Sequence, residues 1–362
     1  MRRQLSLPIA LAGGLLACDD ALVQPAVPDH DAQRAALVAG ESWEVFTVAT
    51  SQDGYAYAAG INDSGVIVGY IDEGNVRAYR YSAGSMTTYL SPEGYISAQE
   101  INKSGQIVGS IRVTGTLRAY VRQADGSLDL LPYGGPAGSH NIGVAINDAG
   151  EVAGNSTGED VPTLGLRWSV AIGGWIVSNL GIILNKPVQF VHDINNAGWI
   201  VGAVADNTFW HGARAFVHTP GGGGSLQLIG TLGGQSIAWS VNSSGKVVGS
   251  SELVTGAPRA FSWTSFGGMK NEGAIAHRGA PTAISDKGRF VAHERVNGRW
   301  RVFTVYNGVR TTLPLLPNAR SSYLSDVNSC GAIVGYMAMN DGSTRAVRWR
   351  RVVGKPLFPV CD

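Results

Sequence analysis

The sequence predicts an all-β protein: a seven-bladed β-propeller of four-stranded antiparallel blades, with the ring closed by the N-terminal strand. Three observations predict this fold class. A short phrase recurs seven times, the composition is typical of short strands and tight turns, and a strand-like segment precedes the first repeat. A period near 40–45 residues with four strands per unit is typical of propeller blades.

The recurring phrase reads Ile/Val-Asn-x-x-Gly, followed in most copies by an apolar pair and a second Gly, and its starts lie 40 to 48 residues apart. Asn-x-x-Gly between apolar runs favours a hairpin turn that the Asn oxygen caps and whose Gly adopts the left-handed conformation. The second Gly allows another backbone to approach closely. The sixth copy is degraded, with Ser285 for Asn and Ala292 for Gly. The copies span residues 61–69, 101–109, 146–154, 194–202, 241–249, 284–292 and 327–335.

A third strand with the pattern Arg-Ala-aromatic follows most copies, as at residues 77–79 and 118–120, and a weaker fourth strand closes each unit. We interpret the repeated arginines as structural residues that bond a neighbouring strand or carbonyl. The third copy departs from the pattern and carries Trp168 instead.

Composition supports strands and limits the classes of partner. Charged residues are 15% of the chain and glycines number 49 of 362, which favours tight turns over helices. The net charge of +1 gives no electrostatic basis for nucleic-acid binding. No second apolar stretch is long enough to cross a bilayer, so we expect a monomeric, soluble body with no cofactor.

The N-terminal residues have the pattern of an export signal. Arg2 and Arg3 precede an apolar run at residues 5–16, which is too short to span a bilayer. The sequence Leu15-Leu16-Ala17-Cys18 resembles the lipobox of bacterial lipoproteins, whose cysteine is acylated. We expect a signal peptide over residues 1–17 and membrane attachment through a lipid on Cys18. The protein would then be an exported, membrane-anchored lipoprotein, in the periplasm or on the cell surface.

The ends of the chain indicate how the ring closes. Residues 18–40, with Pro25 and Pro28 and no periodic apolar face, predict a flexible tether, and residues 41–362 form the propeller. The strand at residues 43–48 lies where a fourth strand for the last blade is needed, because the proline-rich segment 356–360 is a poor strand. Cys330 and Cys361 remain for a disulfide that would fix the closure.

The repeat resembles the bacterial extracellular HAF repeats over about residues 41–351. The resemblance rests on the recurring phrase, on the leading alanines Ala58, Ala98 and Ala238, on the Arg-Ala-aromatic strand, and on the Leu-Gly-Gly ending at residues 232–234. It implies export and a propeller-like fold. It implies no activity and supplies no catalytic residues.

Residues that break the repeat are the better functional candidates, because the fold alone does not require them. Just before the phrase, the opening strands carry four ionisable side chains that would face the channel or its mouth: Glu100, His192, Asp193 and Asp326. They are the weak candidates for acid–base catalysis. The Asn-Asp-x-Gly turns lack the fixed oxygen spacing of a calcium loop, so no metal is expected.

Two functions follow. The first is a non-catalytic binding or interaction scaffold for a glycan, peptide or protein, with contact aromatics at Trp199, Trp210, Trp239 and Trp300. The alternative is an extracellular polysaccharide hydrolase or lyase with its site at the channel mouth. Convergence of the four ionisable side chains on one place is the observation that favours the enzyme.

Overall fold

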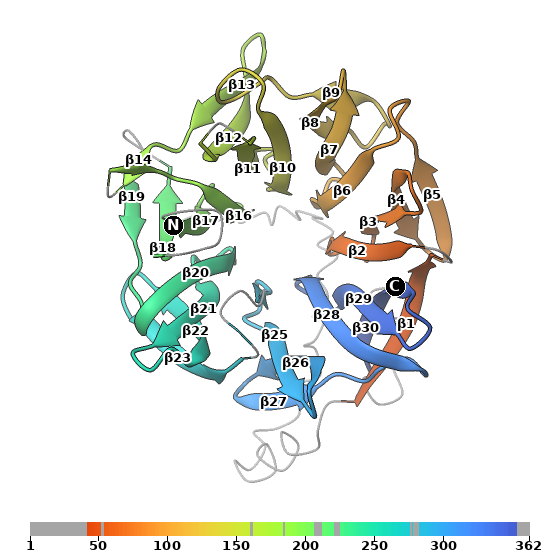
Figure 1. Cartoon of the computed structure of the whole chain (residues 1–362), viewed down its shortest axis with the longest axis vertical. Helices are drawn as coiled ribbons and strands as arrows, with labels where there is room; N and C mark the ends of the chain where they lie inside the picture. The colour runs from red at the N-terminus through yellow and green to blue at the C-terminus, as the bar shows by residue number, and fades with distance from the viewer. Residues whose placement is uncertain are drawn as a thin grey trace, which may run out of the picture.

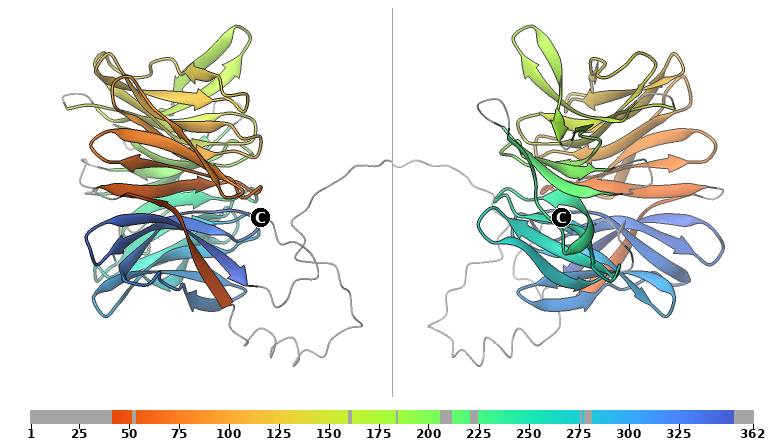
Figure 2. Two further views of the ribbon diagram at one scale, coloured as in Figure 1. Left: turned by 90° about the vertical axis from the view of Figure 1, so that its right-hand side faces the viewer. Right: turned by 60° about the vertical axis from the view of Figure 1, so that its left-hand side comes forward.

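Seven four-stranded antiparallel sheets surround a central channel (Figure 1). The computed structural model describes residues 42–51, 54–159, 162–183, 185–205, 212–220, 225–275, 277 and 282–352. Side views show the blades side by side around the ring (Figure 2). The predicted seven-bladed β-propeller is confirmed. Within the described ranges there is no helix long and apolar enough to cross a membrane.

The strands follow one another blade by blade. Blade 1 contains β2 (Tyr55–Ile61), β3 (Ile67–Asp72), β4 (Val76–Ser82) and β5 (Ser85–Tyr89). Blade 2 contains β6 (Ile96–Ile101), β7 (Ile107–Val113), β8 (Thr116–Arg122) and β9 (Leu128–Leu130). Blade 3 contains β10 (His140–Ile146), β11 (Val152–Thr157), β12 (Leu164–Ala171) and β13 (Gly174–Asn179). A short hairpin of β14 (Ile182–Ile183) and β15 (Lys186–Pro187) follows.

The second half of the ring has the same order. Blade 4 contains β16 (Phe190–Ile194), β17 (Ile200–Val204), β18 (Arg214–Thr219) and β19 (Ser225–Leu228). Blade 5 contains β20 (Gly233–Val241), β21 (Val247–Leu253), β22 (Pro258–Thr264) and β23 (Gly268–Ala274). Blade 6 contains β24 (Ala283–Ile284), β25 (Phe290–Val296), β26 (Arg299–Tyr306) and β27 (Val309–Thr312). Blade 7 contains β28 (Ala319–Val327), β29 (Ile333–Met339), β30 (Thr344–Val352) and β1 (Ser42–Thr50).

The last blade is completed by the first strand of the chain. Its strand order is β1-β30-β29-β28, and β1 runs antiparallel to β30 with Ser42 opposite Val352. This is the predicted closure. It joins strands from the two ends of the chain in one sheet, so that β1 covers the edge of β30. The segment 356–360 and Cys361 lie outside the described residues, so the disulfide stays a prediction.

The recurring Asn-x-x-Gly turn has the predicted form. In blade 1 the Gly65 N–H donates to the Asn62 carbonyl oxygen at 3.0 Å, and the Asn62 N–H donates to the Val66 carbonyl oxygen at 3.1 Å. Gly65 has a φ of 76°, the left-handed region that a side chain disfavours. The Asn62 oxygen Oδ1 accepts the Val66 N–H at 3.0 Å, which is the predicted cap.

The second Gly of the phrase is required by close packing. A Cβ added to Gly69 would lie 1.9 Å from the Tyr57 carbonyl oxygen and 2.8 Å from the Tyr79 hydroxyl. The Tyr79 ring is fully buried on this glycine and donates its hydroxyl to the Tyr57 carbonyl at 2.9 Å. The aromatic of the third strand therefore packs where the glycine leaves room.

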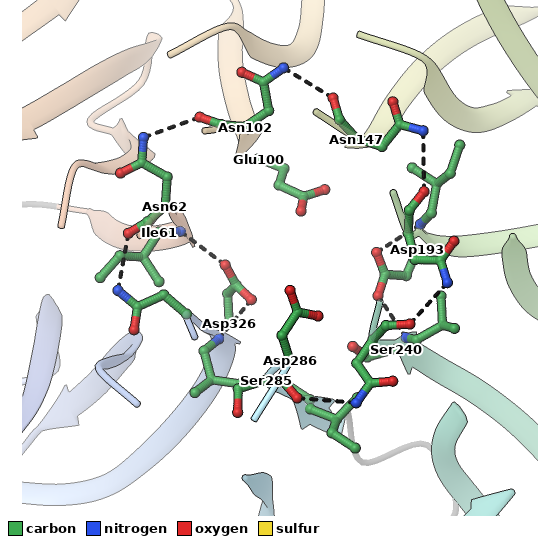
Figure 3. Close-up of a pocket in the computed structure, with 18 of the residues that line it drawn as sticks. Ile61, Asn62, Glu100, Asn102, Asn147, Asp193, Ser240, Ser285, Asp286 and Asp326 are labelled. Atoms are coloured by element: carbon green, nitrogen blue, oxygen red, sulfur yellow. Dashed lines mark hydrogen bonds between the residues drawn. The ribbon is translucent and has the colours of Figure 1, made fainter. Parts of the chain in front are cut away.

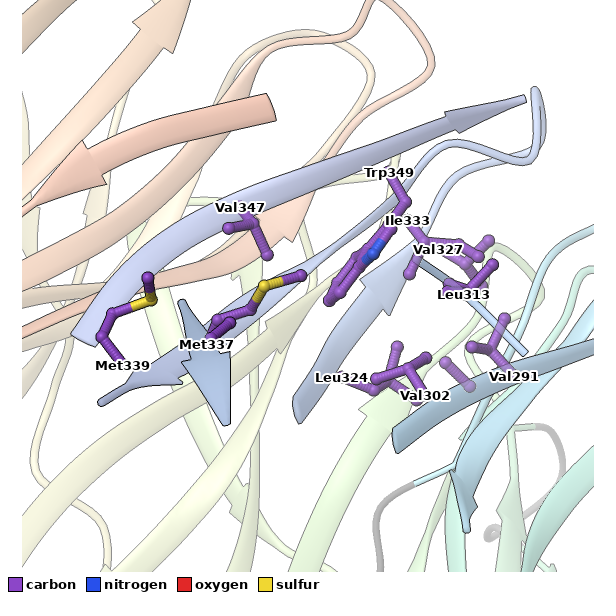
Figure 4. Close-up of a cluster of buried hydrophobic side chains, with 12 residues drawn as sticks. Val291, Val302, Leu313, Leu324, Val327, Ile333, Met337, Met339, Val347 and Trp349 are labelled. Atoms are coloured by element: carbon purple, nitrogen blue, oxygen red, sulfur yellow. The ribbon is translucent and has the colours of Figure 1, made fainter. Parts of the chain in front are cut away.

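Apolar cores lie between neighbouring blades. In the core that joins blades 6 and 7, Val302 and Leu324 from facing blades pack with Met337 and Trp349 (Figure 4). Trp349 is fully buried and donates Nε1–H to the Pro314 carbonyl oxygen at 2.8 Å. Full burial of each such side chain contributes about 1.5–3 kcal/mol. These cores stabilise the strands that carry the side chains lining the channel.

Candidate functional site: the mouth of the central channel

A cavity of about 290 Å³ lies at the end of the channel where the Asn-x-x-Gly turns meet. A β-bulge in the innermost strands positions its lining: in blade 2, for example, Ala98 and Glu100 pair with consecutive residues of β7 and Gln99 is left unpaired. The bulge recurs in six blades, and its unpaired residue lines the cavity in each, as does Thr282 just before β24 in blade 6. These residues are Ala59, Gln99, Val144, His192, Trp239, Thr282 and Ser325.

A ring of asparagine amides joins the blades around this cavity (Figure 3). In six blades, the Asn of the turn donates its side-chain amide to a main-chain carbonyl of the next blade. The donations run from Asn62 to Asn102 (3.1 Å), Asn102 to Asn147 (3.0 Å), Asn147 to Asn195 (3.1 Å), Asn195 to Asn242 (2.9 Å), Asn242 to Ser285 (3.3 Å) and Asn328 to Asn62 (3.0 Å). Each asparagine thus caps its own turn and bonds the neighbouring turn.

Three predicted acidic residues also connect blades. Each sits just before the recurring phrase and accepts a main-chain N–H of the following blade. The pairs are Glu100 with Ile146 (3.0 Å), Asp193 with Val241 (2.8 Å) and Asp326 with Ile61 (2.9 Å). All three also line the cavity. We call these contacts the carboxylate latches.

The three latches differ in how many carboxylate oxygens they use. Asp326 uses both, because Oδ1 accepts the Val327 N–H at 2.6 Å while Oδ2 accepts the Ile61 N–H. Asp193 likewise binds the Ile194 N–H through Oδ1. Glu100 uses Oε2 alone, and its Oε1 has no hydrogen-bond partner in the part of the chain that the structure describes. Glu100 therefore has the oxygen available to a ligand.

The environment of the latches favours their protonated forms. Burial raises the pKa of Asp193 and that of Asp326 to about 6 each. Burial also raises the pKa of Glu100 well above its usual range, and repulsion from the Asp193 and Asp326 carboxylates adds to this. Glu100 thus keeps its proton to a higher pH than an exposed glutamate does.

His192 and Trp239 form a stacked pair on one side of the cavity. Their ring centroids lie 4.1 Å apart. His192 Nδ1 lies 2.7 Å from the Ala238 carbonyl oxygen, to which it donates, and burial lowers the His192 pKa to about 4. The imidazole is therefore neutral at physiological pH. Trp239 donates Nε1–H to Ser250 Oγ at 3.0 Å.

The four ionisable candidates thus come together, whereas the four candidate tryptophans do not. Of the latter, Trp239 lines the cavity. Trp199 packs against the core of blades 4 and 5, and Trp300 packs against the core of blades 5 and 6. Trp210 and Cys18 lie outside the described residues.

Two of the repeated arginines bond main-chain carbonyl oxygens. Arg118 donates to the Leu131 carbonyl oxygen and Arg301 to the Arg320 carbonyl oxygen, at 2.5 and 2.9 Å, in the structural role expected of these arginines. Among the described residues, no group of three or more His, Cys, Asp and Glu side chains is arranged to hold a metal ion. Cys330 lies in the turn of blade 7, with Sγ 3.8 Å from the Asp63 carbonyl oxygen.

Comparison with family models and with curated proteins found no match. The resemblance to HAF repeats therefore stays a prediction. Among solved structures, a streptogramin B lyase is similar with a TM-score of 0.59 and 10% identity, over 86% of this chain and 98% of that one. A catalytically inactive virginiamycin B lyase from Staphylococcus aureus gives 0.57 and 9%, over 86% of this chain and 100% of that one. A Mycobacterium tuberculosis puromycin-hydrolyzing peptidase gives 0.54 and 13%, over 84% of this chain and 50% of that one. At these identities the similarity shows the fold alone, a β-propeller.

Proposed function

We propose that the protein is an exported, lipid-anchored β-propeller that binds a ligand at the channel mouth without transforming it. The sequence of residues 1–18 supports export and anchoring. The cavity where seven blades present different side chains on a shared frame supports ligand binding.

The hydrogen bonds of the carboxylate latches carry the non-catalytic part of the proposal. A general acid or base needs an atom that can reach the substrate. Asp193 and Asp326 have both oxygens engaged by main-chain N–H groups, and His192 is held by a carbonyl oxygen. One carboxylate, Glu100, retains an oxygen toward the channel. A single such group serves ligand binding better than paired acid–base chemistry.

The charge of the lining indicates the ligand class. Carboxylates outnumber cations in the lining, which holds Lys103 together with Asp63, Glu100, Asp148, Asp193, Asp286 and Asp326. A bound cation would favour the ionised form of Glu100, which burial and the neighbouring carboxylates otherwise oppose. A concave site with one dominant sign of charge concentrates ligands of the opposite sign. The Trp239 ring adds an aromatic surface beside these charges. We therefore expect a small amine or the basic side chain of a peptide.

Titration calorimetry of the mature protein with spermidine and with tri-lysine tests this proposal. Maltopentaose serves as the uncharged control ligand. We expect a cationic probe to bind at pH 7.5 and Glu100→Gln to weaken binding about tenfold, which corresponds to about 1.4 kcal/mol. Glu159→Gln, at an exposed glutamate, is the matched control and should bind like the wild type. Absence of binding by both cations, or equal binding by Glu100→Gln, would overturn the proposal.

One observation favours the alternative, a polysaccharide hydrolase or lyase. The four ionisable candidates line the same cavity, and three of them have raised pKa values, as a general acid at neutral pH requires. Mass spectrometry of polysaccharides after incubation with the protein separates the two functions. Shortened products that disappear with Glu100→Gln would establish the enzyme, and intact polysaccharide supports the binding protein.

The lipid anchor has its own test. After expression in a bacterial host, the mature protein should partition into detergent and should carry acyl chains on Cys18, as read by mass spectrometry of its N-terminal peptide. Cys18→Ala should remain water-soluble. A wild-type protein that retains residues 1–17, or that partitions like Cys18→Ala, would contradict the anchor.

A further inference from the structure

Two carboxylates point toward the middle of the channel-mouth cavity from opposite sides of the ring (Figure 3). Glu100 comes from β6 in blade 2, and Asp286 comes from the turn after β24 in blade 6. Asp286 Oδ1 accepts the Ser243 N–H at 2.7 Å, and its Oδ2 has no hydrogen-bond partner in the described ranges. Glu100 keeps Oε1 in the same way, because only Oε2 bonds the Ile146 N–H. Both sides of the cavity therefore present a carboxylate oxygen to a ligand.

Each of these carboxylates has a neutral polar neighbour in the lining of the cavity. In blade 6 this is Thr282, which is only 3% exposed and whose hydroxyl has no hydrogen-bond partner among the residues described. In blade 2 it is Gln99, at the unpaired position of the bulge next to Glu100. A buried hydroxyl without a partner is costly, so a ligand that bonds it is favoured. Both sides thus combine a charged oxygen with a neutral one, and an ammonium group can donate to both.

The lining between these two sides is partly apolar. Blades 1 and 3, on either side of blade 2, carry Ala59 and Val144 at the position of Gln99, and blade 5, next to blade 6, carries Trp239. Such side chains can contact methylene groups but offer no acceptor to an ammonium group. The cavity volume of about 290 Å³ suits a small molecule. The lining therefore fits a short apolar chain that has a cationic group at each end.

We propose that the channel mouth binds a linear diamine, with one ammonium group at Glu100 and Gln99 and the other at Asp286 and Thr282. This inference rests on the proposed binding of a cationic ligand and names the class of that ligand. A monoamine satisfies one side only, whereas a diamine bonds the second side without a second association step. Because the two sides belong to different blades of one ring, their separation is fixed. One chain length should therefore fit best.

The cavity supplies a matched control in Asp148, a third carboxylate of its lining. Both oxygens of Asp148 are engaged, since Oδ1 accepts the Lys103 N–H at 2.9 Å and Oδ2 accepts the Asn196 side-chain amide at 2.8 Å. Asp148→Asn removes one negative charge from the lining but no oxygen that is available to a ligand. Asp286→Asn removes both. The pair therefore separates general attraction of cations from a direct contact.

The experiment is titration calorimetry of the mature protein at pH 7.5 with 1,3-diaminopropane, 1,5-diaminopentane, 1,8-diaminooctane and pentylamine. We expect the best diamine to bind about tenfold more tightly than pentylamine, and Asp286→Asn to bind that diamine only as tightly as pentylamine. Asp148→Asn should stay within about threefold of the wild type. Asp63→Asn should behave like Asp148→Asn, because blade 1 adjoins blade 2 and does not lie across the cavity from Glu100. A crystal structure of the wild-type complex needs no variant and should place the two nitrogens at Glu100 Oε1 and Asp286 Oδ2.

The outcomes separate this inference from the proposed function. Equal binding of pentylamine and of every diamine would overturn the diamine site and leave a channel mouth that binds single cationic groups. Diamine affinity that Asp286→Asn retains, or that Asp148→Asn or Asp63→Asn loses to the same extent, would also overturn it. Absence of binding by all four amines and by spermidine would overturn both proposals.

Discussion

Blade 6 and the other six blades use different residues to cap the turn and to contact the next blade. In the six, an asparagine caps its own turn through Oδ1 and joins the next blade through its amide. In blade 6, Ser285 Oγ accepts the Arg289 N–H at 3.0 Å and so preserves the cap. A serine has no amide to reach Asn328 in blade 7. The comparison shows that capping and joining are separable roles of one side chain.

Other residues connect blade 6 to blade 7. The buried His293 accepts the Leu324 N–H of blade 7 through Nε2 at 2.7 Å. Arg289 is buried as well, with its guanidinium 4.4 Å from the Tyr306 ring. A Cβ on Gly331 in the turn of blade 7 would lie 3.0 Å from Arg289 Nε. The sixth repeat thus lacks the asparagine contact, but His293 and Arg289 contact blade 7 in its place.

Blade 3 has a comparable contact at the same position. Asn155 occupies the position equivalent to His293, directly after the second Gly or Ala of the phrase. Its Oδ1 accepts the Val191 N–H of blade 4 at 2.9 Å, and its amide donates to the Val191 carbonyl oxygen at 3.2 Å. Asn155 and His293 therefore use the same position to join the inner strand of the next blade.

The largest effect is expected from removing a complete asparagine contact. Asn147→Ala deletes the cap on the Glu151 N–H and the bond to the Asn195 carbonyl oxygen, both buried, and should lower the free energy of unfolding by about 3 kcal/mol. Asn147→Ser imitates blade 6 by keeping the cap and should lose about 1 kcal/mol. Urea denaturation measures both, and equal losses would show that the two roles are not separable.

The joining role in blade 6 is tested at the histidine. His293→Ala leaves the buried Leu324 N–H without its acceptor and should lower the free energy of unfolding by about 2 kcal/mol. His293→Asn, the residue that blade 3 uses, should recover part of this loss. If the alanine variant is as stable as the wild type, the histidine is not an inter-blade contact.

The asparagine ring and the carboxylate latches should respond differently to pH. Asp193 and Asp326 have pKa values near 6 in the folded protein, above the value near 3.9 of an unfolded chain. Their contribution to stability is complete below about pH 4 and is lost as the pH rises through 6. A pKa raised by about 2 corresponds to about 3 kcal/mol for each carboxylate, so we expect a decline of a few kcal/mol over this window. Asp193→Asn with Asp326→Asn should flatten the profile, and an unchanged slope would contradict the assignment.

The smallest effect is expected from restoring the consensus in blade 6. Ser285→Asn supplies the missing amide opposite the Asn328 carbonyl oxygen and should stabilise the protein by about 1 kcal/mol. Thermal unfolding checks the sign. A lower melting temperature would indicate that blade 6 has adjusted its spacing to serine.

The sequence predicts the local features of the ring well, because they depend on residues close along the chain. The hairpin at Asn62–Gly65, the packing space at Gly69 and the closing strand β1 all follow from turn chemistry, glycine geometry and strand phase. The grouping of Glu100, Asp193 and Asp326 at one cavity also follows from their common position just before the recurring phrase, and His192 lies one residue earlier.

The contacts between blades could not be predicted, because they depend on the register of one repeat against the next. The bulge at Gln99 and the bond from Glu100 to Ile146 leave no local pattern. One signal was present for the asparagine ring. Asp caps such turns in the same way as Asn, so the use of Asn in six of seven copies indicates a role for the amide. No other copy carries a histidine at the position of His293, so the repeat gave no such signal there.

If the carboxylates at the channel mouth hold the ring together, Asp326→Ala should weaken it. Urea denaturation at pH 5 is the suitable measurement, because Asp326 is then mostly protonated and removal of a buried charge does not mask the loss of hydrogen bonds. The N–H groups of Ile61 and Val327 lose their acceptor, so the free energy of unfolding should fall by about 1–3 kcal/mol. Unchanged or greater stability, as expected when a strained functional residue is removed, would contradict the claim.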